Sequence, residues 1–148
     1  MANAEVQSPA AHAGKVRLEV VTPARAVLEV ETDEVVELPG RDGMLGVLPG
    51  HASLMATLGP GAVSYLTAPD KDAGLVVSGG FVVIQDNVIT VLAETAELPA
   101  EIDVARARAG IAAGSGRIAE ATSPDEELAA RDAVAMDEAR VAAAARWA

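Results

Sequence analysis

The sequence predicts a mainly β protein with α-helices: an N-terminal β-sandwich of short strands followed by a C-terminal antiparallel helical hairpin. Short runs rich in valine, leucine and isoleucine, separated by turns with glycine and proline, fill residues 15–98, as in sandwiches and barrels. From residue 99 onward alanine and scattered charges replace the β-branched residues, which favours helices. We therefore expect a flexible leader (1–14), a β-sandwich domain (15–98) and a helical hairpin (99–148).

The strands follow from hydrophobic periodicity. In 16–20, apolar residues alternate with Arg17 and Glu19, the pattern of a strand with one buried face. Further strands are expected at 27–30, 34–38, 44–48, 62–67, 75–77, 81–84 and 88–92. Because the last three runs are almost wholly apolar, we expect both of their faces to be covered. Residues 85–87, Gln-Asp-Asn, suit a hairpin turn.

The first helix should begin near Asp103, a residue that suits exposed helical N–H groups. Gly110, Gly114 and Gly116 follow, and each costs about 1 kcal/mol relative to alanine in a helix interior. We therefore expect this helix to be marginal or to end early.

The second helix should run from Pro124 to about Trp147, with Ser123 as its N-cap and acidic residues in its first turn. Its expected apolar stripe is small and is interrupted by Asp137; it comprises Ala130, Val134, Val141 and Ala145. Small side chains bury little area, so the hairpin is expected to dock weakly and to move.

Composition excludes several classes of function. The formal net charge of −11 and the absence of a basic run disfavour binding to nucleic acid or anionic lipid. With no cysteine and only two histidines, no metal site is expected. No apolar stretch approaches the roughly 20 residues of a membrane span, and the N-terminus does not resemble a secretory signal. We therefore expect a cytoplasmic chain that only a partner could hold at a membrane.

Residues 38–51 carry the most informative pattern. Four glycines and two prolines within fourteen residues predict two tight turns around a short strand. The sequence Ser78-Gly79-Gly80-Phe81 follows, and it lacks the Lys-Ser/Thr of a phosphate loop, so we interpret its glycines as structural. The third block is Ile102-Asp103-Val104-Ala105-Arg106-Ala107.

In this order and spacing, the three blocks resemble the epsilon subunit of F-type ATP synthases from about residue 16 to 109, with a weaker compositional likeness to residue 148. The resemblance implies a non-catalytic rotor-stalk subunit that binds the gamma subunit and the membrane ring of c subunits and couples proton translocation to ATP synthesis. It implies no required cofactor and a peripheral position on the inner face of the bacterial plasma membrane. In this family the hairpin switches between a docked form and an extended form that reaches the alpha and beta subunits and inhibits ATP hydrolysis.

The resemblance assigns contacts with the rotor ring to Asp42, Met44 and His51. Met44 departs from the family, where an acidic residue is common, so Asp42 substitutes for it or Met44 makes an adaptable apolar contact. The structural alternatives are that Met44 packs inward and that His51 only ends a surface turn.

The resemblance also implies ATP as a regulatory ligand, because the third block matches the motif Ile/Leu-Asp-x-x-Arg-Ala. Arg106 would meet phosphate, and Asp103 and an upstream Glu97 would accept from adenine or ribose, with Ala107 completing the motif. The family's second-helix arginines align with Glu138 and Ala142, with Arg140 out of register, which predicts weak affinity. Alternatively, Asp103 caps the helix and pairs with Arg106.

Arg131, Arg140 and Arg146 are the residues through which the resemblance implies inhibitory contacts with acidic segments of the catalytic subunits. Acidic residues outnumber them on this helix, so weak inhibition is expected, or the helix is only a solvated one with i,i+4 pairs. Two other functions stay open: an ATP-sensing module whose hairpin changes conformation, and a small hydrolase using Asp42, His51 and Ser53. We assign no catalytic residue.

Overall fold

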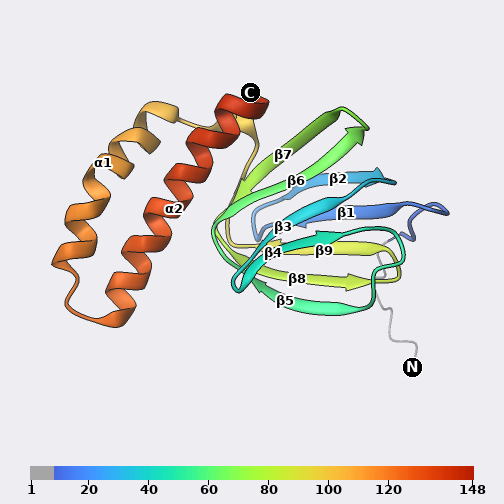
Figure 1. Cartoon of the computed structure of the whole chain (residues 1–148), viewed down its shortest axis with the longest axis horizontal. Helices are drawn as coiled ribbons and strands as arrows, with labels where there is room; N and C mark the ends of the chain where they lie inside the picture. Colours follow the sequence, from blue (N-terminus) through green and yellow to red (C-terminus); the bar gives the residue numbers. More distant parts are fainter. Residues whose placement is uncertain (1–8) are drawn as a thin grey trace.

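The computed structural model describes residues 9–148, which form ten strands, a short 3-10 helix and two α-helices. Figure 1 shows the strands curving around one core, with both helices together on one side. The predicted β-sandwich followed by a helical hairpin is confirmed. The strands are β1 (Val16–Val21), β2 (Ala26–Thr32), β3 (Val36–Gly40), β4 (Gly43–Val47), β5 (Leu54–Leu58), β6 (Gly61–Ala68), β7 (Lys71–Val77), β8 (Gly80–Gln85), β9 (Val88–Ala93) and β10 (Ala96–Glu97).

All ten strands belong to one sheet, in the order β10-β7-β6-β3-β5-β8-β9-β1-β2, with β4 paired to β3. The sheet folds back on itself. A hydrogen bond of 2.7 Å from the Thr32 hydroxyl of β2 to the Leu66 carbonyl of β6 joins the two sides. A strand at one end of the order therefore meets a strand near the other end. This closure encloses the core.

The core is aliphatic, as three aromatic residues in the chain require. Val16, Leu18 and Val20 of β1 are fully buried, as the alternation predicts, but Glu19 on the opposite face is only 6% exposed. The expectation that one face alone is buried was therefore wrong at Glu19, which pairs with Arg17 at 2.9 Å. The other buried members of the aliphatic core are Val36, Leu38, Val47, Leu58, Val63, Leu75, Val77, Val82, Ile84, Ile89, Val91 and Ala93.

The structure differs from the expected strands in two respects: two strands were missed, and two strands have an exposed face. β5 and β10 were missed, since the Leu-Met-Ala-Thr-Leu of β5 holds a single β-branched residue. In β8 and β9 only one face is covered: Phe81 is 55% and Leu92 48% exposed. The expectation that both faces are covered was therefore wrong for β8 and β9. It is confirmed for residues 75–77 of β7, which are all fully buried because α2 packs on their second face.

The turns behave as predicted. Asp86 and Asn87 have φ of 50° and 62°, the left-handed geometry that two-residue hairpin turns use. Gly80 has φ of +136°, and a Cβ there would lie 2.0 Å from the Leu92 carbonyl oxygen. Gly80 is thus structural: it allows a close backbone approach.

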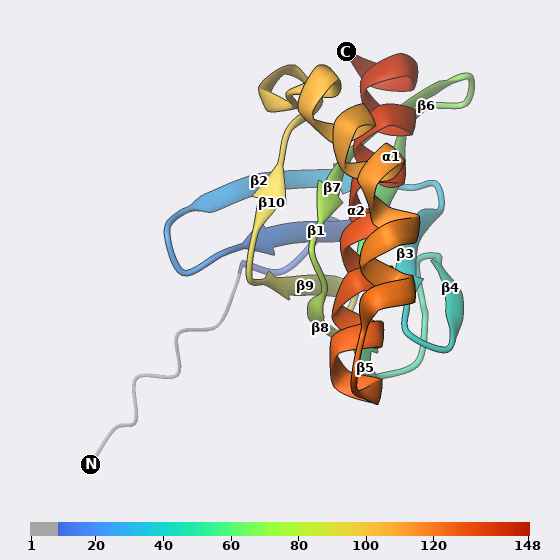
Figure 2. The ribbon, with the colours of Figure 1, turned by 90° about the vertical axis from the view of Figure 1, so that its left-hand side faces the viewer.

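The hairpin follows η1 (Pro99–Glu101) and consists of α1 (Val104–Glu120) and α2 (Pro124–Trp147). The two helices lie side by side in Figure 1, and in Figure 2 α1 lies in front of α2. Both predicted caps form: the Asp103 carboxylate accepts from the Arg106 N–H at 3.1 Å, and the Ser123 hydroxyl from the Glu126 N–H at 3.1 Å. These bonds satisfy N–H groups that have no partner within the helix.

α1 continues through all three of its glycines, so the expectation that it ends early was wrong. A Cβ on Gly110 would lie 2.0 Å from the Asp137 Oδ2, and one on Gly114 would lie 2.1 Å from the Val134 Cγ2. These glycines let α1 and α2 pack closely, and that packing offsets their cost in helix propensity.

α2 packs on α1 with one face and on β6, β7 and η1 with another. The predicted stripe residue Val134 faces α1, whereas Ala145 is exposed. The face toward the sandwich was missed: Met136 and Ala143 are buried there with Val76 of β7, and Trp147 packs against this cluster.

Of the predicted leader 1–14, residues 1–8 lie outside the described residues. Within the rest, the His12 ring nitrogen Nδ1 lies 2.5 Å from the Glu31 Oε2 of β2. The flexibility of the leader stays a prediction.

Candidate functional site

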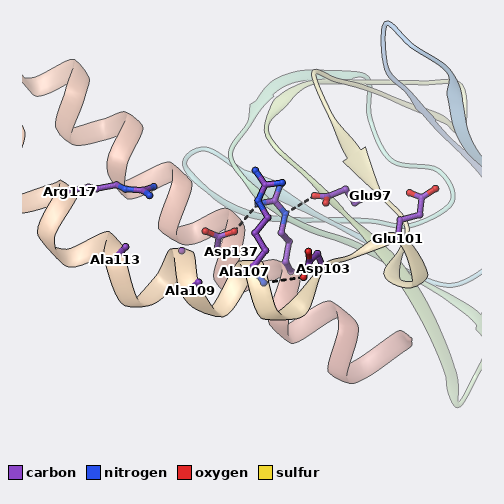
Figure 3. Close-up of a pocket in the computed structure, with 11 residues that line it drawn as sticks. Glu97, Glu101, Asp103, Ala107, Ala109, Ala113, Arg117 and Asp137 are labelled. Carbon is purple, nitrogen blue, oxygen red and sulfur yellow. Dashed lines mark hydrogen bonds and ion pairs between the residues drawn. The ribbon is translucent and has the colours of Figure 1, made fainter.

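The first candidate site is a pocket of about 680 Å³ where the hairpin joins the sandwich (Figure 3). It contains all four residues predicted to bind nucleotide. Its lining comprises Glu97, Glu101, Asp103, Arg106, Ala107, Ala109, Gly110, Ala113, Arg117, Asp137 and Arg140. The chain segment from the end of the sandwich into α1 therefore forms one wall, and α2 forms the other.

Arg140, on the α2 wall, reaches across to Glu97 on the other wall. Its guanidinium donates to the Glu97 Oε2 at 2.7 Å through Nε and to the Asp137 Oδ1 at 2.8 Å through Nη1. Burial lowers the pKa of Arg140, but the two carboxylates outweigh this effect and raise it. Arg140 is therefore a pocket residue, although sequence reasoning placed it out of register.

Asp103 and Arg106 lie at the start of α1 on the pocket wall. The Asp103 carboxylate bonds to the backbone N–H of Arg106. No ion pair between their side chains occurs in residues 9–148, so the Arg106 guanidinium is not tied to the cap. The capping role of Asp103 is confirmed.

The electrostatics of the pocket set a condition on any anionic ligand. Four carboxylates (Glu97, Glu101, Asp103, Asp137) face three guanidinium groups (Arg106, Arg117, Arg140). Arg140 is already neutralised by two carboxylates. A phosphate chain would gain full attraction to Arg140 only by displacing them.

The three arginines predicted to make inhibitory contacts all have partners within the chain. Arg131 pairs with Glu127 at 2.9 Å, one helical turn away. Arg140 pairs as described above, and Arg146 lies 2.5 Å from the Asp72 carboxylate of β7. In this structure these three arginines therefore pair with carboxylates of the hairpin and of the sandwich.

The residues predicted to contact the rotor ring lie at two separate places in the sandwich. Asp42 lies in the turn between β3 and β4, and Met44, just inside β4, is 64% exposed, so Met44 does not pack inward. His51 lies beyond the other end of β4, where its Nδ1 is 2.6 Å from the Ala52 carbonyl oxygen. The extended chain from Met44 to Leu48, which precedes the turn with His51, is roughly 13 Å long, so Met44 and His51 lie at opposite ends of β4.

The positions of Asp42, His51 and Ser53 exclude the hydrolase alternative. Gly50, next to His51, donates its backbone N–H to the Asn87 side chain in the turn between β8 and β9. Gly40, two residues before Asp42, pairs with Leu58, the last residue of β5. Ser53 lies at the opposite end, just before the first residue of β5. Asp42 and the pair His51–Ser53 thus lie at opposite ends of the strands and cannot form a triad.

A third candidate is an exposed apolar face on β5, β8 and β9. Strand register places Met55 beside Val83, and Phe81 beside Leu92. Met55 is 72% exposed, and Phe81 and Leu92 are about half exposed. We call Met55, Phe81, Val83 and Leu92 the outer apolar face. Contiguous exposed apolar area in an acidic chain is typical of a protein-binding surface, so the fold and its surfaces define a subunit that binds partners.

The chain belongs to the family described as the ATP synthase delta/epsilon chain β-sandwich domain, whose profile matches residues 15–99. ATP synthase epsilon chain 2 of Syntrophotalea carbinolica is 44% identical over 115 residues, 78% of this chain and 82% of the relative. The ATP synthase epsilon chain of Brevibacillus brevis is 40% identical over 106 residues, 72% of this chain and 80% of the relative. The predicted family and the prediction of a non-catalytic accessory subunit of the ATP synthase complex are confirmed.

Solved structures share the fold. A chain in the OSCP/F1/c-ring structure of the Euglena gracilis mitochondrial ATP synthase matches with a TM-score of 0.70 at 20% identity, covering 93% of this chain and 83% of that one. A chain in the central stalk/c-ring structure of the Tetrahymena thermophila enzyme matches with a TM-score of 0.58 at 14% identity, covering 87% and 96%. No helix in residues 9–148 is long and apolar enough to cross a membrane. No group of three or more His, Cys, Asp or Glu side chains in these residues is placed to hold a metal ion.

Proposed function

We propose that this chain is a rotor-stalk subunit that binds the gamma subunit through the outer apolar face and the ring of c subunits through the turn between β3 and β4. The observation that carries the proposal is the outer apolar face in a member of the epsilon family. Through these partners the chain would sit at the cytoplasmic side of the bacterial plasma membrane and couple proton translocation to ATP synthesis.

The outer apolar face suits a permanent partner. Phe81 is the only phenylalanine of the chain, and it stands on the surface instead of in the core. Large apolar groups at the centre of an interface supply much of its binding energy. On the turn between β3 and β4, Met44 and the charged Asp42 together offer a mixed surface that suits polar loops of a ring.

Regulation by the hairpin is the second part of the proposal. The pairs that Arg140 and Arg146 make with the sandwich must break before α2 can extend toward the alpha and beta subunits. The helix also carries more acidic than basic residues. Inhibition of ATP hydrolysis is therefore expected to be weak.

The test uses an ATP synthase complex depleted of its own epsilon subunit, to which the full chain or a chain ending at Leu98 is added. The buried cluster of the sandwich includes no helix residue, so the shorter chain keeps that core. Co-elution of both forms, with slower ATP hydrolysis only for the full chain, supports the proposal. Failure of both forms to bind would refute it.

ATP binding in the pocket is a second candidate function. It is favoured by the convergence of Glu97, Asp103, Arg106 and Ala107 on one cavity that also holds Arg140. Because Arg140 is held by two carboxylates, weak affinity is expected.

Isothermal titration of the full chain with ATP tests this second function. Arg106→Ala should abolish the heat of binding, because Arg106 lines the pocket. Arg131→Ala removes an equal charge at an i,i+4 pair outside the pocket lining, so it should bind ATP as the unchanged chain does. No heat with the unchanged chain would exclude ATP as a ligand.

A further inference from the structure

The last turn of α2 makes an unusual contact with β7. The indole N–H of Trp147, the only tryptophan in the chain, donates to the Asp72 Oδ2 at 2.9 Å. The Arg146 Nη2 lies 2.5 Å from the same oxygen, and its guanidinium carbon lies 5.0 Å from the centroid of the Trp147 ring. Two donors from adjacent residues thus converge on one carboxylate oxygen.

The strand provides a matching surface for the indole. A Cβ on Gly74 would lie 2.4 Å from the Trp147 Cη2, so the ring occupies space that any other residue at position 74 would fill. Trp147 also packs against the buried cluster of Val76, Met136 and Ala143. The contact therefore joins apolar packing to a charge-assisted hydrogen bond.

The other ionic contacts between α2 and the sandwich have a different character. Arg41 of the β3–β4 turn pairs with Asp132 of α2 at 2.8 Å, and their side chains are 41% and 31% exposed. The Arg146–Asp72 pair is itself 60% and 31% exposed, and exposed ion pairs contribute little on their own, so what sets the C-terminal contact apart is Trp147. Arg140 pairs with Glu97 at 2.7 Å, but it shares its charge with Asp137 of its own helix. The contact at the C-terminal end of α2 combines ionic, hydrogen-bonding and ring-packing interactions.

We propose that Trp147 and Arg146 form a C-terminal latch, with Asp72 as its catch, and that this latch holds the helical hairpin on the sandwich. When the latch opens, the sandwich side of α2 loses the contact at its C-terminal end and is held by the Met136 cluster and by the pairs of Asp132 with Arg41 and of Arg140 with Glu97. The latch is a property of the isolated chain. Only its consequence, that opening it frees the hairpin to extend within the complex, rests on the proposed function.

The experiment uses the full chain without partners, so its outcome does not depend on whether the proposed function is correct. Trp147 is the only source of tryptophan fluorescence, and its emission wavelength and quenching by acrylamide report its exposure. Hydrogen exchange over residues 136–148 reports docking of α2. Asp72→Ala removes the catch, and Asp70→Ala, at an exposed carboxylate in the turn between β6 and β7, is the matched control.

With Asp72→Ala, we expect red-shifted emission, stronger quenching and exchange of the α2 amides about 5- to 30-fold faster, which corresponds to a loss of about 1–2 kcal/mol of docking free energy. Asp70→Ala should match the unchanged chain. Emission and exchange that stay unchanged in Asp72→Ala would overturn the latch, as would equal changes in both variants.

Discussion

At the scale of single residues, neighbouring glycines of α1 have different surroundings. Gly114 faces α2, where a Cβ would lie 2.1 Å from the Val134 Cγ2. Gly116 has no atom within 4 Å of the place a Cβ would take. The first is required by helix packing, whereas the second only lowers the helix propensity of α1.

We therefore expect Gly114→Ala and Gly116→Ala to change stability in opposite directions. The first forces a methyl group against a short, stiff side chain and should destabilise the chain by about 1–3 kcal/mol. The second should stabilise α1 by up to about 1 kcal/mol. Thermal unfolding followed by circular dichroism at 222 nm measures both, and a stabilising Gly114→Ala would contradict the packing described for α1 and α2.

The sequence predicted the residues that act locally and missed those that act across the chain. Asp103 and Ser123 cap helices through N–H groups three residues away, so their roles follow from local rules. The partner of Trp147 is Asp72, 75 residues away, and Arg140 meets Glu97 across 43 residues. No local pattern reveals such pairs.

At the scale of elements, two aspartates take part in ion pairs between α2 and the sandwich, Asp72 of β7 and Asp132 of α2. The indole N–H of Trp147, assisted by Arg146, lowers the pKa of Asp72. The Arg41 guanidinium likewise lowers the pKa of Asp132. A carboxyl group whose pKa is lowered by docking stabilises the docked form above its ordinary pKa and loses that effect as the pH falls through the lowered value.

Acid should therefore release α2 from the sandwich. We expect Trp147 fluorescence to stay constant from neutral pH down to about 5 and to shift toward that of exposed indole below about 3.9, the ordinary pKa of aspartate. The measurement is an emission titration at constant ionic strength, with circular dichroism to separate undocking from unfolding. A shift centred near neutral pH would show that other groups control docking.

The sequence predicted eight of the strands, because their β-branched runs and turn residues act locally. β5 could not be recognised, since its residues suit helix and strand alike. Strand pairing decides which face of β8 and β9 stays uncovered, and periodicity cannot show it when both faces are apolar. For the same reason, the sequence did not indicate the outer apolar face.

At the scale of the whole molecule, the sandwich presents two surfaces and the hairpin a third. The outer apolar face lies on β5, β8 and β9, the turn with Asp42 and Met44 lies at the end of β3 and β4, and α2 covers β6 and β7. One small domain can therefore contact two partners while its hairpin stays docked (Figure 1).

The most direct test compares two charged substitutions at similarly exposed apolar residues, Phe81→Asp on the outer apolar face and Leu128→Asp on α2, which are 55% and 52% exposed. Each variant is added to an ATP synthase complex lacking its epsilon subunit, and co-elution is measured after unchanged thermal stability is confirmed. We expect Phe81→Asp to weaken binding by at least about tenfold, as at an interface hot spot, and Leu128→Asp to bind normally. Normal binding of a folded Phe81→Asp variant would contradict the assignment of this face to the stalk.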